Sequence, residues 1–600
     1  MKRIKQKFQK LFYLIKKAIY FAWYRHHFLI PPSALIKYMK SFFNVLKRSG
    51  TSSDLFFNQK AYLEWREKNQ IEVKYQKFKY NPLISIIIPT YNVSKDLLSE
   101  CLDSILNQSY KNFEICICDD KSTNEETIKT LKEYQKKDKR IKVIFRKENG
   151  MISASSNDAI KIAKGEFLVL VDNDDTIDKD ALYHFVSVLN KDKTIDLIYS
   201  DEDKIDMKGN YLEPHFKPDF SPDTFLGMNY ICHLVCLRKK IVLEIGGFRS
   251  EYDGSQDYDL LLRFIEKTKN IYHLDKILYH WRQSPNSTST YLGNKSYAYI
   301  AGKKALLDYF KRNNINALVL DNKVSSTYLI KYLHDNPKVS IIIPMKDKVE
   351  LTKTCVDSLI NKVNYKNYEI IIVNNNSVLD ETYEFFKEYK EKYKNFKVLD
   401  INEEFNYSRL NNQAVKISKG EYILLLNNDT EVLDPNFLDE MVGYASQEHV
   451  GCVGLKLLYK DKKVQHAGVV LSYGGVAGHV FVTSNHDDKG LFNRLSMPYD
   501  YSAVTAACLM VKKDKYLMVD GLDENLKVAL NDVDFNLKLL KKGYYNVCLN
   551  HVTMYHYESR SRGYEVSKEK QERFLQESLY MKNKWKDFLL EDKFFSKNNF

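Results

Sequence analysis

The sequence predicts an α/β fold made of two tandem domains, each built on a mostly parallel sheet. The first observation is a long internal repeat, because the stretch 84–175 returns 255 residues later without a net insertion. Ile84-Ser-Ile-Ile-Ile-Pro89 returns as Val339-Ser-Ile-Ile-Ile-Pro344, and Asp172-Asn-Asp-Asp175 returns as Asn427-Asn-Asp-Thr430. A repeat of this length indicates a duplicated domain and not a solenoid unit.

The second observation is an alternation of strand and helix patterns within the first copy. Leu83–Pro89 is apolar apart from Ser85, long enough for a buried strand and too short for a helix. A helical pattern follows from Leu97 to Leu106, and further strands are predicted at Phe113–Cys118, Ile141–Phe145 and Phe167–Val171. Strands that alternate with helices indicate a parallel sheet covered on both faces.

Length and composition agree with this architecture. Six hundred residues correspond to about three to five domains of roughly 100–200 residues, and 44% apolar residues are enough for a core in each copy. We expect a basic N-terminal extension with a helical neck at 1–80, a first domain at 81–300, a helical linker at 301–337, a second domain at 338–566 and a C-terminal helix at 567–600.

The net charge of +13 belongs to the N-terminal extension. Residues 1–53 contain twelve Lys or Arg and no acidic residue, so the remainder of the chain is nearly neutral. A nucleic-acid-binding surface on the domains would need clustered basic residues there, so a nucleic-acid partner is not expected. The nine cysteines show neither a disulfide framework nor zinc-site spacing, which indicates a reducing compartment.

The extension alternates apolar and basic residues between Leu11 and Arg25. It lacks the ~20 consecutive apolar residues of a membrane span. A basic amphipathic helix of this kind is typical of an anchor on anionic lipid. We therefore expect a cytoplasmic protein, peripheral on the inner face of the cell membrane; the alternative is a solvated extension packed on the first domain.

Acidic residues follow two neighbouring predicted strands. Asp119-Asp120 comes after one strand and Asp172-Asn-Asp-Asp175 after another, and ligands of such sheets bind where strands end. One such cluster would more often be a helix cap or a turn. Two clusters of hard oxygen ligands suit Mn²⁺ or Mg²⁺ holding a diphosphate. No dinucleotide-binding glycine motif and no P-loop is present.

Short motifs in this order resemble the GT-A-fold, family-2 inverting glycosyltransferases of bacterial surface polysaccharide synthesis. The resemblance covers about 83–290 and, in the second copy, about 338–563. Its motifs are Pro89-Thr-Tyr-Asn92, Asp119-Asp120, Asn149-Gly150, Gly165-Glu166, Asp172-Asn-Asp-Asp175, Gly254-Ser-Gln-Asp-Tyr-Asp259 and His280-Trp-Arg282.

The resemblance implies roles for the first copy. It makes Asp257 the catalytic base, which takes the proton of the acceptor hydroxyl. It makes Asp174 a ligand of the divalent cation, with His280 as a further ligand or, alternatively, a packed core histidine. It assigns donor binding to Pro89, Asn92, Asp119, Asp120 and Asp172.

The second copy departs from this pattern. About 20 residues are inserted before its later motif, and we place much of the insertion at 465–479. The copy is similar to rhamnosyltransferase-like members, which have Asn where others have Asp. The resemblance then implies Asp532 as base, Asp429 and His556 (in the place of His280) at the cation, and Pro344, Asn375 and Asn427 at the donor. A degenerate structural copy is the alternative, because a shared fold does not establish activity.

Three functions follow. The favoured one is a bifunctional transferase that moves sugars from nucleotide-sugar donors to a lipid-linked saccharide. The second is a single-site transferase whose other domain binds the acceptor. The third, a nucleotidyltransferase, is disfavoured because the sequence lacks an early glycine-rich phosphate loop.

Overall fold

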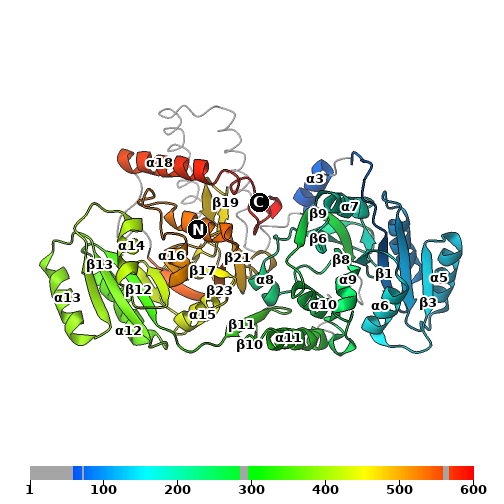
Figure 1. Ribbon diagram of the computed structural model, residues 1–600, viewed down its shortest axis with the longest axis horizontal. Helices are drawn as coiled ribbons and strands as arrows, with labels where there is room; N and C mark the ends of the chain where they lie inside the picture. Colours follow the sequence, from blue (N-terminus) through cyan, green and yellow to red (C-terminus); the bar gives the residue numbers. More distant parts are fainter. Residues whose placement is uncertain (1–58, 70–72, 284–294, 558–566, 600) are drawn as a thin grey trace, which may run out of the picture. The chain divides into compact units, whose positions relative to one another are not determined.

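The computed structural model describes residues 59–69, 73–283, 295–557 and 567–599 (Figure 1). The predicted anchor helix lies outside the described residues. The segment in which we expected a helical neck contains the helix α3 (Gln59–Asn69). Tyr62 and Arg66 of α3 both contact Asp203 in the first domain.

The first domain contains the predicted α/β sheet. Its strands run in the order β3-β2-β1-β4-β8-β6-β9-β5, with β7 paired to β6, and the first four are parallel. The strands are β1 (Ile84–Thr90), β2 (Phe113–Asp119), β3 (Ile141–Phe145), β4 (Phe167–Leu170), β5 (Thr176–Ile177), β6 (Leu197–Ile205), β7 (Tyr211–His215), β8 (Val235–Arg238) and β9 (Ile271–Arg282). Its helices are α4 (Lys95–Leu106), α5 (Glu125–Lys137), α6 (Met151–Ile162), α7 (Ala181–Lys191), α8 (Pro222–Gly227), α9 (Lys239–Glu244) and α10 (Gln256–Ile265).

The second domain repeats this order as β14-β13-β12-β15-β22-β17-β23-β16, with β18 and β21 at its margins. The strands are β12 (Val339–Met345), β13 (Tyr368–Asn374), β14 (Phe396–Asp400), β15 (Tyr422–Leu426), β16 (Thr430–Val432), β17 (Val450–Leu458), β18 (Val464–His466), β21 (Pro498–Tyr501), β22 (Cys508–Lys512) and β23 (Tyr545–His556). The helices are α12 (Val349–Lys362), α13 (Asp380–Lys392), α14 (Tyr407–Ile417), α15 (Phe437–Ala445), α16 (Lys513–Met518), α17 (Asn531–Lys541) and α18 (Lys568–Lys584).

One buried hydrogen-bond network recurs in both sheets and explains the repeated polar residues. In the first domain Ser85 Oγ donates to Glu114, which also accepts from Lys142. Ser340, Glu369 and Lys397 make the same contacts in the second domain. In both, the serine Oγ accepts from the amide of the repeated glycine, as in Gly165 N at 2.8 Å. A Cβ at Gly165 would lie 2.6 Å from Ser85 N, so only glycine fits.

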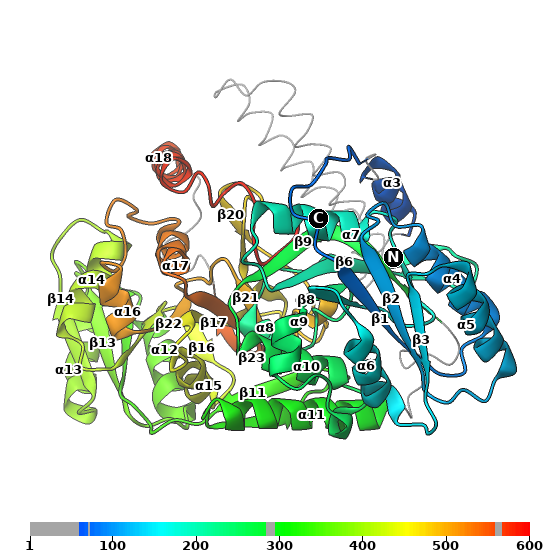
Figure 2. The same cartoon turned by 45° about the vertical axis from the view of Figure 1, so that its right-hand side comes forward.

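The linker holds more structure than a helix. α11 (Lys295–Arg312) covers the predicted helical stretch, and a hairpin of β10 (Ala317–Asp321) and β11 (Tyr328–Tyr332) follows it (Figure 2). The sequence predicted only the helical part of this linker, and the hairpin was not expected.

Polar contacts join the domains. Asp500 of β21 accepts from Thr224 N and Oγ1 of α8, at 3.0 and 3.2 Å. The chain beyond α18 returns to the first domain, where Asp219 N donates to Lys593 O at 2.7 Å. The predicted C-terminal helix is α18, which ends at Lys584. The residues after it pack between the domains.

Candidate active sites and family membership

In the first domain, Asp172 and Asp174 lie just beyond the carboxyl end of β4. Burial and the charge of Asp172 raise the pKa of Asp174. His233 Nε2 lies 3.7 Å from Asp172 Oδ2, and its ring stacks on that of Tyr279 with centroids 4.6 Å apart. Two carboxylates and one imidazole therefore meet at this strand end.

His280 lies elsewhere. Its Nδ1 is 2.5 Å from Asp203 Oδ1, in the cluster that Tyr62 and Arg66 complete. Its neighbours along β9, Tyr279 and Trp281, both contact the ring of His233. Because side chains alternate along a strand, His280 points to the opposite face. The structure therefore brings His233, which the sequence analysis missed, to the aspartates in place of His280.

The predicted base Asp257 lies in the first turn of α10. Its Oδ2 accepts from Asn229 Nδ2 at 3.0 Å and is 3.8 Å from Cys232 Sγ. Burial raises the pKa of Asp257, His233 opposes the rise and Asp172 adds to it. A half-buried carboxylate with a raised pKa is suited to accept a proton.

The predicted donor-binding residues of the first domain lie at the carboxyl ends of β1 and β2 and in the loops that follow. Asp120 Oδ1 accepts from Gly150 N at 2.9 Å and pairs with Arg146 Nε at 3.1 Å. Asp119 Oδ2 accepts from Ser122 N, while its buried Oδ1 has no hydrogen-bond partner within the described part of the chain. In the neighbouring loop, Asn92 Oδ1 accepts from Thr123 N at 2.8 Å, and Pro89 O accepts from Asn173 Nδ2 at 2.9 Å. These contacts gather the four residues at one edge of the sheet.

The second domain brings its predicted residues together at the equivalent edge. His556 Nε2 lies 3.2 Å from Asp429 Oδ1 and 3.3 Å from Asn427 Nδ2. Asp532 lies in the first turn of α17, and its Oδ2 accepts from Ala506 N at 3.1 Å.

Asn375 and Pro344 complete the predicted set of the second domain. Asn375 Nδ2 donates to Ile401 O and Glu403 O, at 3.1 and 2.9 Å. Pro344 lies next to the end of β12, opposite Val373 of β13. Both residues lie at the same sheet edge as their first-domain counterparts, Asp120 and Pro89.

The family model of glycosyl transferase family 2 matches residues 85–246 and 340–513, which is more than half of the chain. The chain belongs to glycosyl transferase family 2. The two matched segments lie in the two tandem α/β domains that the sequence predicted.

Relatives of this chain include bacterial proteins. An uncharacterized protein of Sinorhizobium fredii is 42% identical over 87% of the chain, and the match covers 58% of that relative. The O-antigen biosynthesis protein RfbC of Myxococcus xanthus is 34% identical over 80% of the chain and 38% of its own length. Chondroitin synthase of Escherichia coli is 32% identical over 37% of the chain and 32% of its own length. The chain thus spans roughly two fifths to three fifths of the first two relatives.

Strand register corrects one predicted equivalence between the two domains. Asp203 of β6 pairs with His280, and the corresponding Leu458 of β17 pairs with Tyr555. His556 therefore occupies the position of Trp281, not that of His280. The two domains take their imidazole from different places: His233 precedes β8, and His556 ends β23.

The hairpin of the insertion lies within the predicted stretch 465–479, whose first two residues belong to β18. β18 pairs with β17 as β7 pairs with β6, so that His466 corresponds to His215 and Gln465 to Pro214. The added residues follow β18 and include the hairpin of β19 (Val469–Leu471) and β20 (Ala477–His479).

The carboxylate and imidazole side chains at these strand ends suit a divalent cation that binds few protein ligands. No group of three or more His, Cys, Asp or Glu side chains positioned around a cation occurs in the described ranges. Mg²⁺ commonly takes one or two carboxylates and completes its shell with substrate phosphates and water, at about 2.1 Å. The 3.2 Å between Asp429 Oδ1 and His556 Nε2 is close to the ~3.0 Å separation of adjacent ligands at that bond length.

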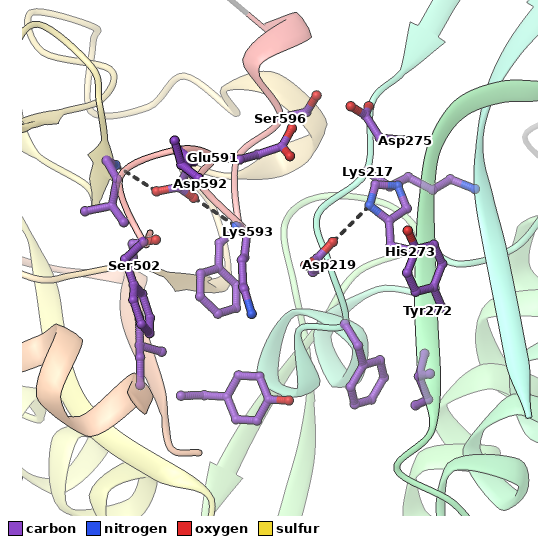
Figure 3. Close-up of a pocket in the computed structure, with 18 of the residues that line it drawn as sticks. Lys217, Asp219, Tyr272, His273, Asp275, Ser502, Glu591, Asp592, Lys593 and Ser596 are labelled. Carbon is purple, nitrogen blue, oxygen red and sulfur yellow. Dashed lines mark hydrogen bonds and ion pairs between the residues drawn. The ribbon is translucent and has the colours of Figure 1, made fainter. Parts of the chain in front are cut away.

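A separate cavity of about 840 Å³ lies between the first domain, the second domain and residues 587–596 (Figure 3). On one wall His273 lies between Asp201 and Asp219, with nitrogen–oxygen distances of 2.9 and 3.2 Å. On the other wall Asp592 accepts from Leu471 N at 2.7 Å. The aspartates of the two predicted active sites do not line it.

Within the described residues, every helix is too short or too polar to cross a bilayer.

Proposed function

We propose that the chain is a bifunctional, inverting, metal-dependent glycosyltransferase with one donor site in each domain. A single repeated arrangement carries the proposal: one segment touches both the proposed base and the metal-motif residue. In the first domain Cys232 is 3.8 Å from Asp257, and the adjacent His233 is 3.7 Å from Asp172.

The equivalent segment of the second domain also contacts both the proposed base and the metal motif. Ala506 N donates to Asp532, and the adjacent Ala507 O accepts from Asn427 N at 3.0 Å. Each domain thus sets a carboxylate of a helix first turn against the strand end that would hold the sugar diphosphate. This arrangement supports two sites of the same reaction type.

In the proposed reaction, Asp257 or Asp532 removes the proton of an acceptor hydroxyl. The hydroxyl oxygen attacks the anomeric carbon from the face opposite the nucleoside diphosphate, and the carbon–oxygen bond to the diphosphate breaks with inversion. A bound Mn²⁺ or Mg²⁺ would supply positive charge to the departing diphosphate. Asp174 in one domain, and Asp429 with His556 in the other, would hold that cation.

We propose nucleotide sugars as donors and a lipid-linked cell-surface saccharide as acceptor. The named functions of two relatives, O-antigen biosynthesis and chondroitin synthesis, support a polysaccharide product. The twelve basic residues of segment 1–53 would hold the enzyme at anionic lipid on the inner face of the membrane. On this proposal the enzyme is peripheral and meets its acceptor at the membrane surface.

The test is nucleoside diphosphate release from a panel of UDP-, dTDP- and GDP-sugars, with and without Mn²⁺ and with a crude membrane acceptor. Wild type, Asp257→Asn and Asp532→Asn are compared. If each variant loses the turnover of a different donor, both sites are active. Absence of turnover with every donor in the wild type would contradict the proposal.

The alternative is a single-site transferase whose second domain binds the acceptor. Asn375 and Asn427 favour it, because they replace a charged Asp120 and Asp172 and supply no charge to a cation. In this case Asp532→Asn leaves all donor turnover intact, whereas Asp257→Asn abolishes it.

A further inference from the structure

His556 of the second domain has polar partners at both ring nitrogens. On one side its Nε2 faces Asp429 Oδ1 and Asn427 Nδ2, at 3.2 and 3.3 Å. On the other side its Nδ1 lies 3.2 Å from Oε1 of Gln465 on β18. His556 and Gln465 are both buried, with 6% and 8% of their surfaces exposed. The orientation of this imidazole is therefore set by contacts at both ring nitrogens.

The partners indicate where the ring proton lies. A neutral imidazole has one N–H and one lone pair. When Gln465 Oε1 accepts from Nδ1–H, the Nε2 lone pair can accept from Asn427 Nδ2 and, with a cation present, share that cation with Asp429 Oδ1 at 3.2 Å. A histidine that binds a metal commonly donates its other ring N–H to an oxygen in this way.

The first domain lacks both members of this pair. Trp281 occupies the position of His556, and Pro214 occupies that of Gln465. Its imidazole comes instead from His233, whose position in the second domain is held by Ala507. A hydrogen-bonding acceptor on the strand next to β17 thus accompanies the histidine on β23 in one domain, and both are missing in the other.

We propose that Gln465 is a positioning residue that keeps His556 in the Nδ1–H form and directs Nε2 toward a divalent cation beside Asp429. The inference deepens the proposed function, because it rests on metal dependence of the second site. Removal of such an outer partner typically lowers metal affinity about 10–100-fold.

The first test measures Mn²⁺ affinity by electron paramagnetic resonance of free Mn²⁺, with UDP, dTDP or GDP present. Asp174→Asn is introduced in the full chain so that the signal reports the second site. Gln465→Leu should weaken Mn²⁺ binding about 10–100-fold, whereas Gln465→Glu, which keeps an acceptor oxygen, should bind Mn²⁺ at least as tightly as the parent. Equal affinities of parent and Gln465→Leu, or equal losses in both variants, would overturn the proposal.

The second test needs neither metal nor nucleotide. In chain labelled with [¹⁵N]histidine, the ring signals of His556 are those that disappear in His556→Gln. We expect a protonated Nδ1 in the parent, because Gln465 accepts there, and a bare Nδ1 in Gln465→Leu, where only Nε2 keeps an acceptor in Asp429. A bare Nδ1 in the parent contradicts the inference.

The two tests separate the failure of the inference from that of the proposed function. If Asp429→Asn leaves Mn²⁺ binding unchanged, the metal dependence of the second site is wrong. The ¹⁵N measurement still decides whether Gln465 sets the tautomer of His556.

Discussion

The two domains share a sheet and its supporting hydrogen bonds, but they differ in the polar residues at the carboxyl ends of the strands. Both hold their sheets with the same serine, glutamate, lysine and glycine contacts. At the sheet edge, Asp120 and Asp172 of the first domain give way to Asn375 and Asn427 in the second. A buried polar network can therefore fix the fold while the charge of the ligand-facing residues varies independently.

The largest expected effect on transfer comes from replacing the proposed bases one at a time. A positioned general base contributes about 10²–10⁴-fold to a rate. Asp257→Asn and Asp532→Asn should each lower transfer at their own site by that factor, with donor binding retained. Separate kinetics for each domain's donor would measure this, and near-normal transfer in either variant would refute that base.

Histidine substitutions in the first domain test which imidazole belongs to the metal motif. His233→Ala should weaken binding of UDP with Mn²⁺ at the first site, because it removes the imidazole that lies 3.7 Å from Asp172. His280→Gln should instead lower stability, since it removes the imidazole partner of the buried Asp203. Calorimetric titration and thermal unfolding of both variants test this; weaker nucleotide binding in His280→Gln would restore that residue to the site.

A pH titration separates the domains further. Burial lowers the pKa of His273, but Asp201 and Asp219 outweigh it and raise the pKa to about 9. The equivalent position in the second domain is Cys548.

The stability from His273 should be fully present below its ordinary pKa of 6.5 and lost as pH rises through about 9. A shift of this size corresponds to about 3 kcal/mol. The difference in unfolding free energy between wild type and His273→Gln should therefore shrink between pH 6 and pH 10. A difference that stays constant over this range would contradict the assignment.

The smallest expected effect concerns equivalent helix starts. Asn124 caps α5 through Glu126 N, whereas Leu379 begins α13 without a side-chain cap. Asn124→Ala should cost about 1 kcal/mol, and Leu379→Asn should add about 0.5–1 kcal/mol. Urea unfolding measures both; destabilisation by Leu379→Asn would show that the exposed leucine contributes packing there.

The shared sheet was predictable because its signal is local. Runs such as Leu83–Pro89 and the acidic residues after them identify buried strands and their carboxyl ends without knowledge of tertiary contacts. The β10–β11 hairpin was not, because it lies outside the repeated stretch and has no second copy to support its pattern.

The source of each imidazole could not be read from motif order. β6 and β9 change register near Asp201, and β17 and β23 change register near Lys456. A one-residue shift moves a side chain to the other face of a sheet. The sequence held a faint sign of it, since 23 residues separate Asp257 from His280 and 24 separate Asp532 from His556.

The contact between Asp219 and Lys593 has a consequence for the order of assembly. A ribosome adding about 5–20 residues per second delivers Lys593 roughly 20–75 s after Asp219. The first domain has its whole sheet available long before that, so it can fold while the second is still being made. The wall that residues 587–596 give to the cavity is therefore added last, as a late step that joins two finished domains.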